Sequence, residues 1–136
     1  MTFRESSIRV INFTGKTDDH KIWESKFLAK AGKIGYKKIL LGKVKIPSDV
    51  EYATALAVAE ATRSTSQLET ISAYETNSVA YADLILAMDG ETNNGKVAWS
   101  LVDGSKTSEN PDGDAALAFK RLRENISRKQ HHHMFV

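Results

Sequence analysis

Hydrophobic residues recur at helical spacing along most of this chain. Trp23, Phe27 and Ala31 fall at positions i, i+4 and i+8, which places them on one face of a helix, while lysines occupy much of the other face. Leu28 and Ile34 widen the apolar face. Gly32 and Gly35 interrupt this pattern. Apolar residues resume from Tyr36 to Leu41, and Gly42 ends this second stretch. The pattern therefore predicts one helix from about Thr17, with breaks at Gly32 and Gly35, and a second, short helix over residues 36–41.

Two capping boxes mark the starts of further helices. Ser48 is followed three residues later by Glu51, and Ser66 is followed in the same way by Glu69. In this arrangement the Ser side chain and the acidic side chain bond each other's backbone N–H groups at the first turn. We expect the first box to begin an alanine-rich helix that ends at Thr62, and the second to begin a longer helix that follows it.

The second half of the chain continues the helical pattern. The long helix carries an apolar stripe made of Ile71, Tyr74, Ser78, Tyr81, Ile85 and Met88. Thr92 is expected to cap the next helix, whose inward stripe is Val97, Leu101 and Val102. Asn110-Pro111 is expected to start the last helix, whose apolar positions are Ala115, Ala118, Phe119, Leu122 and Ile126.

These elements predict an all-α protein with a single globular domain of five or six short-to-medium helices. The domain is expected to span residues 1–127, and residues 128–136 to form a flexible basic and histidine-rich tail. We expect the following ten side chains to be mostly buried: Trp23, Phe27, Tyr36, Leu40, Tyr81, Ile85, Trp99, Leu101, Phe119 and Leu122.

The amino-acid composition excludes several kinds of functional site. The 136 residues suit one domain, and the absence of cysteine excludes disulfides, thiol nucleophiles and zinc knuckles. No apolar run approaches membrane-spanning length, and the first residues lead into no segment typical of a signal peptide. We therefore expect no membrane partner and a cytoplasmic location.

The net charge of +2 hides a marked segregation of charge. Residues 1–46 carry a net +7, residues 47–119 a net −9, and residues 120–136 a net +4. One interpretation is solvated helix faces that differ in sign. The other is a protomer with a basic and an acidic surface that meets its own copies head to tail. Possible phosphate contacts lie in the basic first third, at Lys26, Lys30, Lys33, Lys37 and Lys38.

The residues that most resemble a catalytic or metal site have simpler interpretations. His131-His132-His133 lies at the terminus, and His20 is expected to lie in a solvated capping turn. The acidic alternation from Asn110 to Asp114 lacks the Gly and Glu that a calcium loop requires at its sixth and twelfth positions. No glycine-rich phosphate loop and no nucleophile elbow is present. We expect no catalytic residues, no cofactor and no metal, and hence a protein that is not an enzyme.

A set of short motifs resembles the Gag proteins of copia-type LTR retrotransposons. The opening Phe13-x-Gly15, then Trp23, Phe27-Leu28, Gly35-Tyr36 and Leu40-x-Gly42, is similar to the beginning of that family. Ala82-Asp83-Leu84-Ile85 resembles its central helix, and Ala98-Trp99 with Leu101 resembles a later one. The stretch from Asn110 to Ala115, followed by Ala118-Phe119-Lys120-Arg121-Leu122, resembles its last segment. The match covers roughly residues 10–127.

This resemblance implies a helical capsid-like domain that self-associates into virus-like particles and packages the element's RNA. Its signature core would be Phe13, Gly15, Trp23, Phe27, Tyr36, Gly42, Trp99, Phe119 and Leu122. The chain departs from the family in lacking a Cys/His zinc knuckle and any protease, integrase or reverse transcriptase segment. The alternative is a helical adaptor, or a nonspecific nucleic-acid-binding module that uses the basic residues 1–46.

Overall fold

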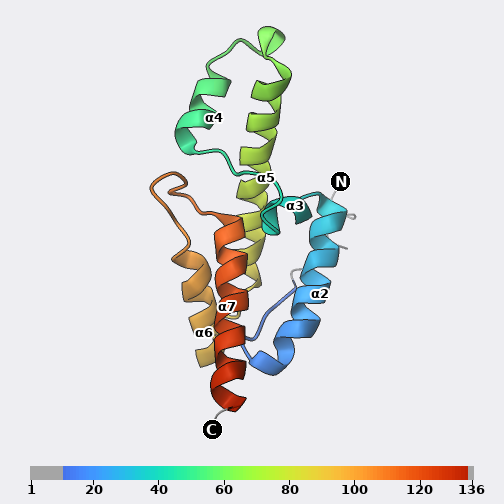
Figure 1. The fold of residues 1–136 in the computed structure, drawn as a ribbon, viewed down its shortest axis with the longest axis vertical. Coiled ribbons are helices and arrows are strands. Elements are labelled where there is room, and N and C mark those ends of the chain that lie inside the picture. Colours follow the sequence, from blue (N-terminus) through green and yellow to red (C-terminus); the bar gives the residue numbers. More distant parts are fainter. Residues whose placement is uncertain (1–10, 135–136) are drawn as a thin grey trace.

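The computed structural model describes residues 11–134, with side chains described as far as residue 129. Within that range the chain forms six α-helices and one short 3-10 helix, which confirms the all-α class (Figure 1). The elements are α2 (Thr17–Ile34), α3 (Lys37–Leu40), α4 (Asp49–Leu56), η1 (Glu60–Thr62), α5 (Thr65–Ala87), α6 (Asn93–Asp103) and α7 (Ala115–Met134). Helix α5 contacts α3, α6 and α7 along its second half, whereas α4 packs on its first half and projects above the rest.

Helix α2 passes the first of its two predicted breaks. It continues through Gly32 to Ile34 and has Gly35 as its C-cap, so the break predicted at Gly32 is wrong and the one at Gly35 is confirmed. Gly32 lies on the exposed side of the helix, where a missing side chain removes no core contact. The helix buries Trp23 and Phe27 as expected. Burial of these two rings outweighs the cost of about 1 kcal/mol that one glycine adds to a helix interior.

The first capping box forms as predicted. The Glu51 N–H donates to Ser48 Oγ at 3.1 Å, and the Ser48 N–H donates to the Glu51 carboxylate at 3.0 Å. Helix α4 nevertheless ends well before the predicted boundary, at Leu56. The Arg63 guanidinium donates to the carbonyls of Leu56 at 3.2 Å and Val58 at 3.0 Å. Because Arg63 satisfies these carbonyls, the chain can leave the helix and pass through η1 to reach α5.

The second capping box lies two residues earlier than predicted. Ser64, not Ser66, caps α5, and its partner is Gln67, not Glu69. A glutamine amide oxygen accepts the same backbone bond as a carboxylate, so both registers satisfy the pattern. The helix buries Asn77, Ala80, Tyr81, Leu84 and Ala87, a stripe rotated from the predicted one. It ends at Ala87, before the predicted stripe residue Met88, which forms an isolated β-bridge with Phe13.

Helix α6 presents a different face to the core from the predicted one. Thr92 caps it as expected, but its buried residues are Gly95, Ala98 and Val102. A Cβ atom at Gly95 would lie 1.8 Å from the Asp89 carbonyl oxygen. The helix therefore approaches its neighbours through its smallest residues, which turns Val97 outward to 46% exposure.

Helix α7 begins later and ends later than expected. Asp114, not Asn110, accepts a bond from the first turn, since the Leu117 N–H donates to its carboxylate at 2.9 Å. The predicted stripe from Ala115 to Ile126 is buried throughout. The helix continues to Met134, beyond the boundary expected at residue 127. The side chains of His131–His133 and the residue Phe135 lie outside the described part, so the flexibility of the tail stays a prediction.

Most of the predicted core is confirmed. Seven of the ten side chains are at most 7% exposed: Trp23, Phe27, Tyr36, Leu40, Tyr81, Phe119 and Leu122. Ile85 and Leu101 are half-buried and pack against this cluster. Trp99 is 42% exposed, so the prediction that it is a core residue is wrong. The rotation of α6 that buries Gly95 and Ala98 is the reason.

Candidate functional site

Six of the signature residues form one aromatic-rich cluster. The ring of Trp23 stacks on Phe13 at 4.8 Å and on Phe27 at 5.0 Å between ring centroids. Phe119 approaches Phe27 at 6.5 Å from α7, and Tyr36 approaches the same ring at 6.2 Å. Leu122 is buried in the same cluster. These residues are far apart in sequence but form the centre of the fold, so burial accounts for their role.

The cluster is anchored by polar bonds at its edges. The Trp23 indole N–H donates to the Ile11 carbonyl at 2.9 Å. The Tyr36 hydroxyl donates to the Asp83 carboxylate at 2.7 Å, and Lys30 lies 3.7 Å from that carboxylate. Burial and then the bond to Asp83 raise the Tyr36 pKa far above its ordinary value. The hydroxyl therefore stays protonated and acts as a hydrogen-bond donor that links α3 to α5.

Gly15 has a structural requirement of its own. Its φ is +82°, and a Cβ atom there would lie 2.1 Å from the carbonyl oxygen of Asn94. Both the backbone conformation and the close approach of the α6 N-terminus therefore demand glycine. Gly42 also has a positive φ, of +72°, but it is exposed and has open space around it. Gly42 and Trp99 are thus signature residues that lie outside the buried core.

The candidate phosphate-binding lysines do not form one uniform set. Lys26, Lys33, Lys37 and Lys38 are exposed on α2 and α3. Lys30 differs, because its side chain is only 9% exposed and its ammonium group pairs with Asp83. Its ammonium also lies 6.0 Å from the centre of the Phe27 ring. Four of the five predicted positions are therefore available to a ligand at the surface, and the fifth joins α2 to α5.

His20 is not in a solvated turn, so that prediction is wrong. It is 8% exposed and lies against the rings of Phe13 at 5.5 Å and Trp23 at 5.9 Å. Burial lowers the His20 pKa, while Glu24 opposes and Arg123 reinforces that shift. Glu24 and Arg123 form an ion pair with each other beside it. A neutral imidazole at this position is part of the aromatic packing and not a cap.

Two buried asparagines were missed by the sequence interpretation. The Asn77 side chain donates to the Gly113 carbonyl at 3.0 Å and accepts from the Ala115 N–H at 2.9 Å. Asn110 donates to the Pro47 carbonyl at 2.8 Å. These amides tie the loop before α7 to α5 and to the start of α4. The only sign of this role in the sequence was that Asn77 lies at the edge of the predicted apolar stripe of α5.

The acidic loop that superficially resembles a calcium site has this structural role. Asn110 turns its amide inward, and Asp114 caps α7. Among the described residues, no group of three or more His, Asp or Glu side chains could hold a metal ion. The loop therefore positions helices.

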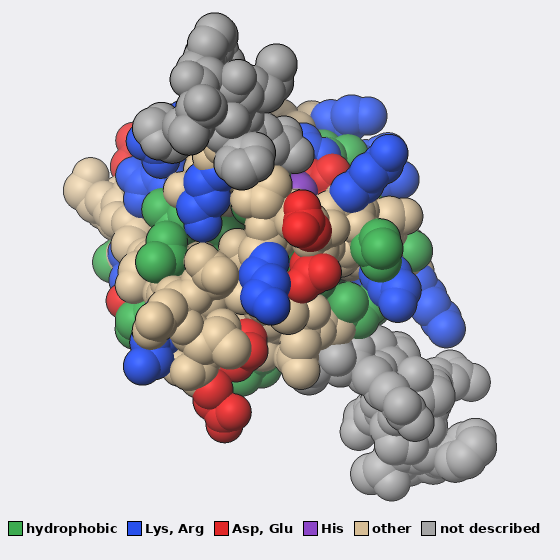
Figure 2. Space-filling view, turned by 90° about the horizontal axis from the view of Figure 1, so that it is seen from below, with side chains coloured by type: hydrophobic (Ala, Val, Ile, Leu, Met, Phe, Trp, Pro, Cys, Tyr) green, Lys and Arg blue, Asp and Glu red, His purple; other side chains and the backbone are tan. Residues whose placement is uncertain are grey.

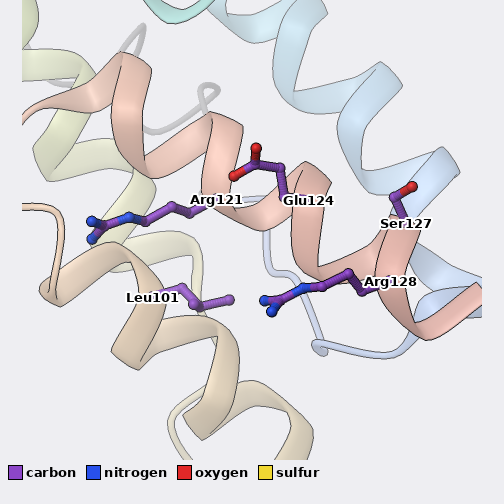
Figure 3. A pocket seen from close by; sticks show the side chains of 5 residues that line it. All are labelled: Leu101, Arg121, Glu124, Ser127 and Arg128. Carbon is purple, nitrogen blue, oxygen red and sulfur yellow. The ribbon is translucent and has the colours of Figure 1, made fainter. Parts of the chain in front are cut away.

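A groove lies between α6 and α7 (Figure 3). Its volume is about 550 Å³, and its lining residues are Leu101, Arg121, Glu124, Ser127 and Arg128. The Arg121 guanidinium also donates to the Gly104 carbonyl at 2.7 Å, which ties α7 to the end of α6. Leu101 supplies an apolar floor beside charged walls. The lining offers charge and hydroxyl contacts.

A further surface is formed by α4, η1 and the first part of α5, residues 48–75, which we call the projecting hairpin. Within it the rings of Tyr52 and Tyr74 stack at 3.9 Å with an angle of 8° between their planes. The Tyr74 hydroxyl donates to Asp49 at 2.5 Å, and that bond with partial burial raises the Tyr74 pKa to about 12. Tyr52 donates to Glu75 at 2.8 Å. These bonds fix α4 on α5.

The projecting hairpin exposes large aliphatic side chains. Val50 is 74% exposed, Leu56 41% and Leu68 51%, whereas the only buried residue of α4 is Ala55. The hairpin carries five acidic residues and one arginine. Its surface is therefore acidic with apolar positions, and α4 contributes little to the core.

Comparisons with models of known protein families, with curated protein sequences and with solved structures found no match to this chain. In the described part of the chain, no helix is both long and apolar enough to cross a membrane.

Proposed function

We propose that this chain is a non-enzymatic structural protein, a Gag-like capsid domain of the copia type that self-associates into particles. The order and spacing of its short motifs support this proposal. Six of the nine signature residues also pack into a single cluster, which gives a physical reason for their occurring together. The remaining three have other roles or positions, so the signature describes the fold more than a ligand site.

The observation that carries the proposal is the projecting hairpin. A helix that buries one alanine and exposes Val50 and Leu56 contributes little to the stability of its own domain. Together with Leu68, this element exposes three large aliphatic side chains, and apolar side chains that form a continuous exposed patch are typical of protein–protein contact surfaces. The capping box and the stacked tyrosines hold this element in a defined shape, which favours a specific partner. In the proposed particle, that partner is another protomer.

The test is sedimentation equilibrium of nuclease-treated protein from micromolar to millimolar concentration, at low and high salt. We expect the mean mass to rise with concentration at both salt levels, because apolar contacts supply most of the affinity. The double variant Val50→Ser/Leu68→Ser should stay closer to the monomer mass. The matched control is Ile22→Ser, which removes a 64% exposed aliphatic side chain from α2. A wild-type protein that is monomeric throughout would contradict the proposal.

A second candidate function is nonspecific nucleic-acid binding. The observation that favours it is the exposure of Lys26, Lys33, Lys37 and Lys38 on neighbouring helices. Lysine contacts with phosphates release counterions, so the affinity for a single-stranded RNA should fall steeply as salt increases. Replacing Lys37 and Lys38 by Gln should weaken binding equally for unrelated RNA sequences. An affinity that does not change with salt would reject this candidate.

A further inference from the structure

The acidic surface of the projecting hairpin has a chemical complement on the same molecule. Residues 26–45 contain seven lysines and no acidic residue. We call this segment, the second half of α2 with α3 and the loop after it, the basic segment. It also exposes two aliphatic side chains, Ile34 at 40% and Val44 at 37%. Lysines and exposed aliphatics thus lie together, as acids and exposed aliphatics do on the hairpin.

Few of these charges are matched within one protomer. Among the described residues, Lys45 pairs with Glu51 at 3.6 Å and Lys30 pairs with Asp83 at 3.7 Å. On the hairpin, Glu60 and Glu69 are exposed, and neither forms an ion pair with another described residue. Glu60 and Glu69 on the hairpin, and the five lysines of the basic segment other than Lys30 and Lys45, can therefore meet opposite charges on another molecule.

We propose that the projecting hairpin of one protomer docks on the basic segment of a second copy of this chain. This inference rests on the proposed self-association and names the surfaces that make the contact. Exposed side chains such as Val50 and Leu68 supply affinity against Ile34 and Val44 by burying apolar area. The surrounding charges select the partner surface and fix the orientation.

Charge also decides which surfaces can meet. If hairpin faced hairpin, each side of the contact would carry a net charge of −4. Two basic segments facing each other would be worse, since neither contains an acid to offset its lysines. Like charges placed opposite each other disfavour an interface strongly. The contact therefore joins unlike surfaces, the hairpin of one copy to the basic segment of another. Where it forms once between two copies it is heterologous, and it leaves one free surface of each kind at the ends of every open oligomer.

A heterologous contact has a consequence for the assembly. Each added copy presents a new hairpin and a new basic segment, so the same contact repeats until it closes into a ring or continues as a lattice. The end of the molecule opposite the hairpin has a different character. There, basic and acidic side chains are interspersed, and hydrophobic ones appear in small separate groups (Figure 2).

The test is a charge-reversal cycle followed by sedimentation velocity. The hairpin variant is Glu60→Lys/Glu69→Lys, and the basic-segment variant is Lys37→Glu/Lys38→Glu; all four side chains are exposed. The matched control, Lys21→Glu/Lys96→Glu, reverses two exposed lysines outside both surfaces. Far-UV circular dichroism and thermal melting establish that each variant is folded.

Each reversal alone should weaken association at least about tenfold, because like charges then face each other. Combining both reversals in one chain should restore it, and the control should associate like the wild type. Restoration is the decisive result, since it requires that the two surfaces touch. Loss with the hairpin reversal alone, without loss from the basic-segment reversal, would overturn the inference, because the hairpin would then contact some other surface. Association unchanged by either reversal would also overturn it, while leaving the proposed self-association intact. Only a monomeric wild type would contradict the proposed function itself.

Discussion

The two tryptophans of this chain provide a direct test of the core. Trp23 is 3% exposed, stacks on Phe13 and Phe27, and donates a hydrogen bond to the Ile11 carbonyl. Trp99 is 42% exposed on α6. Both belong to the motif set that resembles Gag proteins, so the sequence alone predicts that both are buried core residues. The structure predicts very different contributions to stability.

The magnitude follows from what each side chain contacts. Replacing Trp23 by Ala removes a buried ring between two others and should cost about 3–5 kcal/mol. That is a large share of the roughly 5–15 kcal/mol by which a typical domain is stable. Trp23→Phe should keep part of the stacking and leave the Ile11 carbonyl unpaired, at a cost of about 1–3 kcal/mol. Trp99→Ala should cost about 1 kcal/mol or less, as for other partly exposed positions.

Urea unfolding followed by far-UV circular dichroism measures these differences without relying on the tryptophans. Fluorescence then gives an independent check on burial. In Trp99→Phe, the remaining Trp23 should emit at short wavelength and be protected from an aqueous quencher. In Trp23→Phe, the remaining Trp99 should be quenched readily. Equal losses of stability for Trp23→Ala and Trp99→Ala would refute the assigned helix faces.

Three further predictions concern single positions. Asn77→Ala should cost about 2–4 kcal/mol in urea unfolding, because it leaves a buried carbonyl and a helix N–H unpaired, whereas its exposed neighbour Ser78→Ala should change stability little. Gly15→Ala should lower the melting temperature strongly, since it meets both a positive φ and a 2.1 Å contact, and Gly42→Ala should lower it less because only the positive φ applies. Burial lowers the His20 pKa below the ordinary 6.5, so the unfolded chain binds the proton more readily, and the urea midpoint should fall as the pH drops below about 6.5. His20→Phe should flatten that pH dependence, and an unchanged slope would contradict the burial of His20.

The local pattern of apolar and capping residues was sufficient to predict much of the fold. The spacing of Trp23, Phe27 and the α7 stripe identified their buried faces, because those helices pack through large apolar residues. The Ser48 capping box was also predicted, since its two bonds depend only on residues within one turn. Periodicity and capping therefore identify an element well when the element's own side chains decide its position.

The features that were predicted wrongly or missed depend on tertiary contacts, which cannot be inferred from the local sequence pattern. Helix α6 turns its small residues inward because Gly95 lies against the Asp89 carbonyl, and this rotates Trp99 outward. Ser64 and Ser66 offered equivalent capping boxes, and the earlier one directly follows Arg63, whose guanidinium bonds the carbonyls of Leu56 and Val58 where α4 ends. The exposed aliphatics of the projecting hairpin were not identifiable individually, because exposure depends on the absence of a packing neighbour.

The most direct test of the proposed function follows protein and RNA in the same sample. Nuclease-treated protein is mixed with a fluorescently labelled RNA and examined by sedimentation velocity, with protein and RNA recorded at separate wavelengths over a wide range of protein concentration. The proposed self-association predicts that the protein boundary sediments faster as concentration rises, whether or not RNA is present. A protein that remains a monomer at every concentration, and sediments faster only together with RNA, would contradict it.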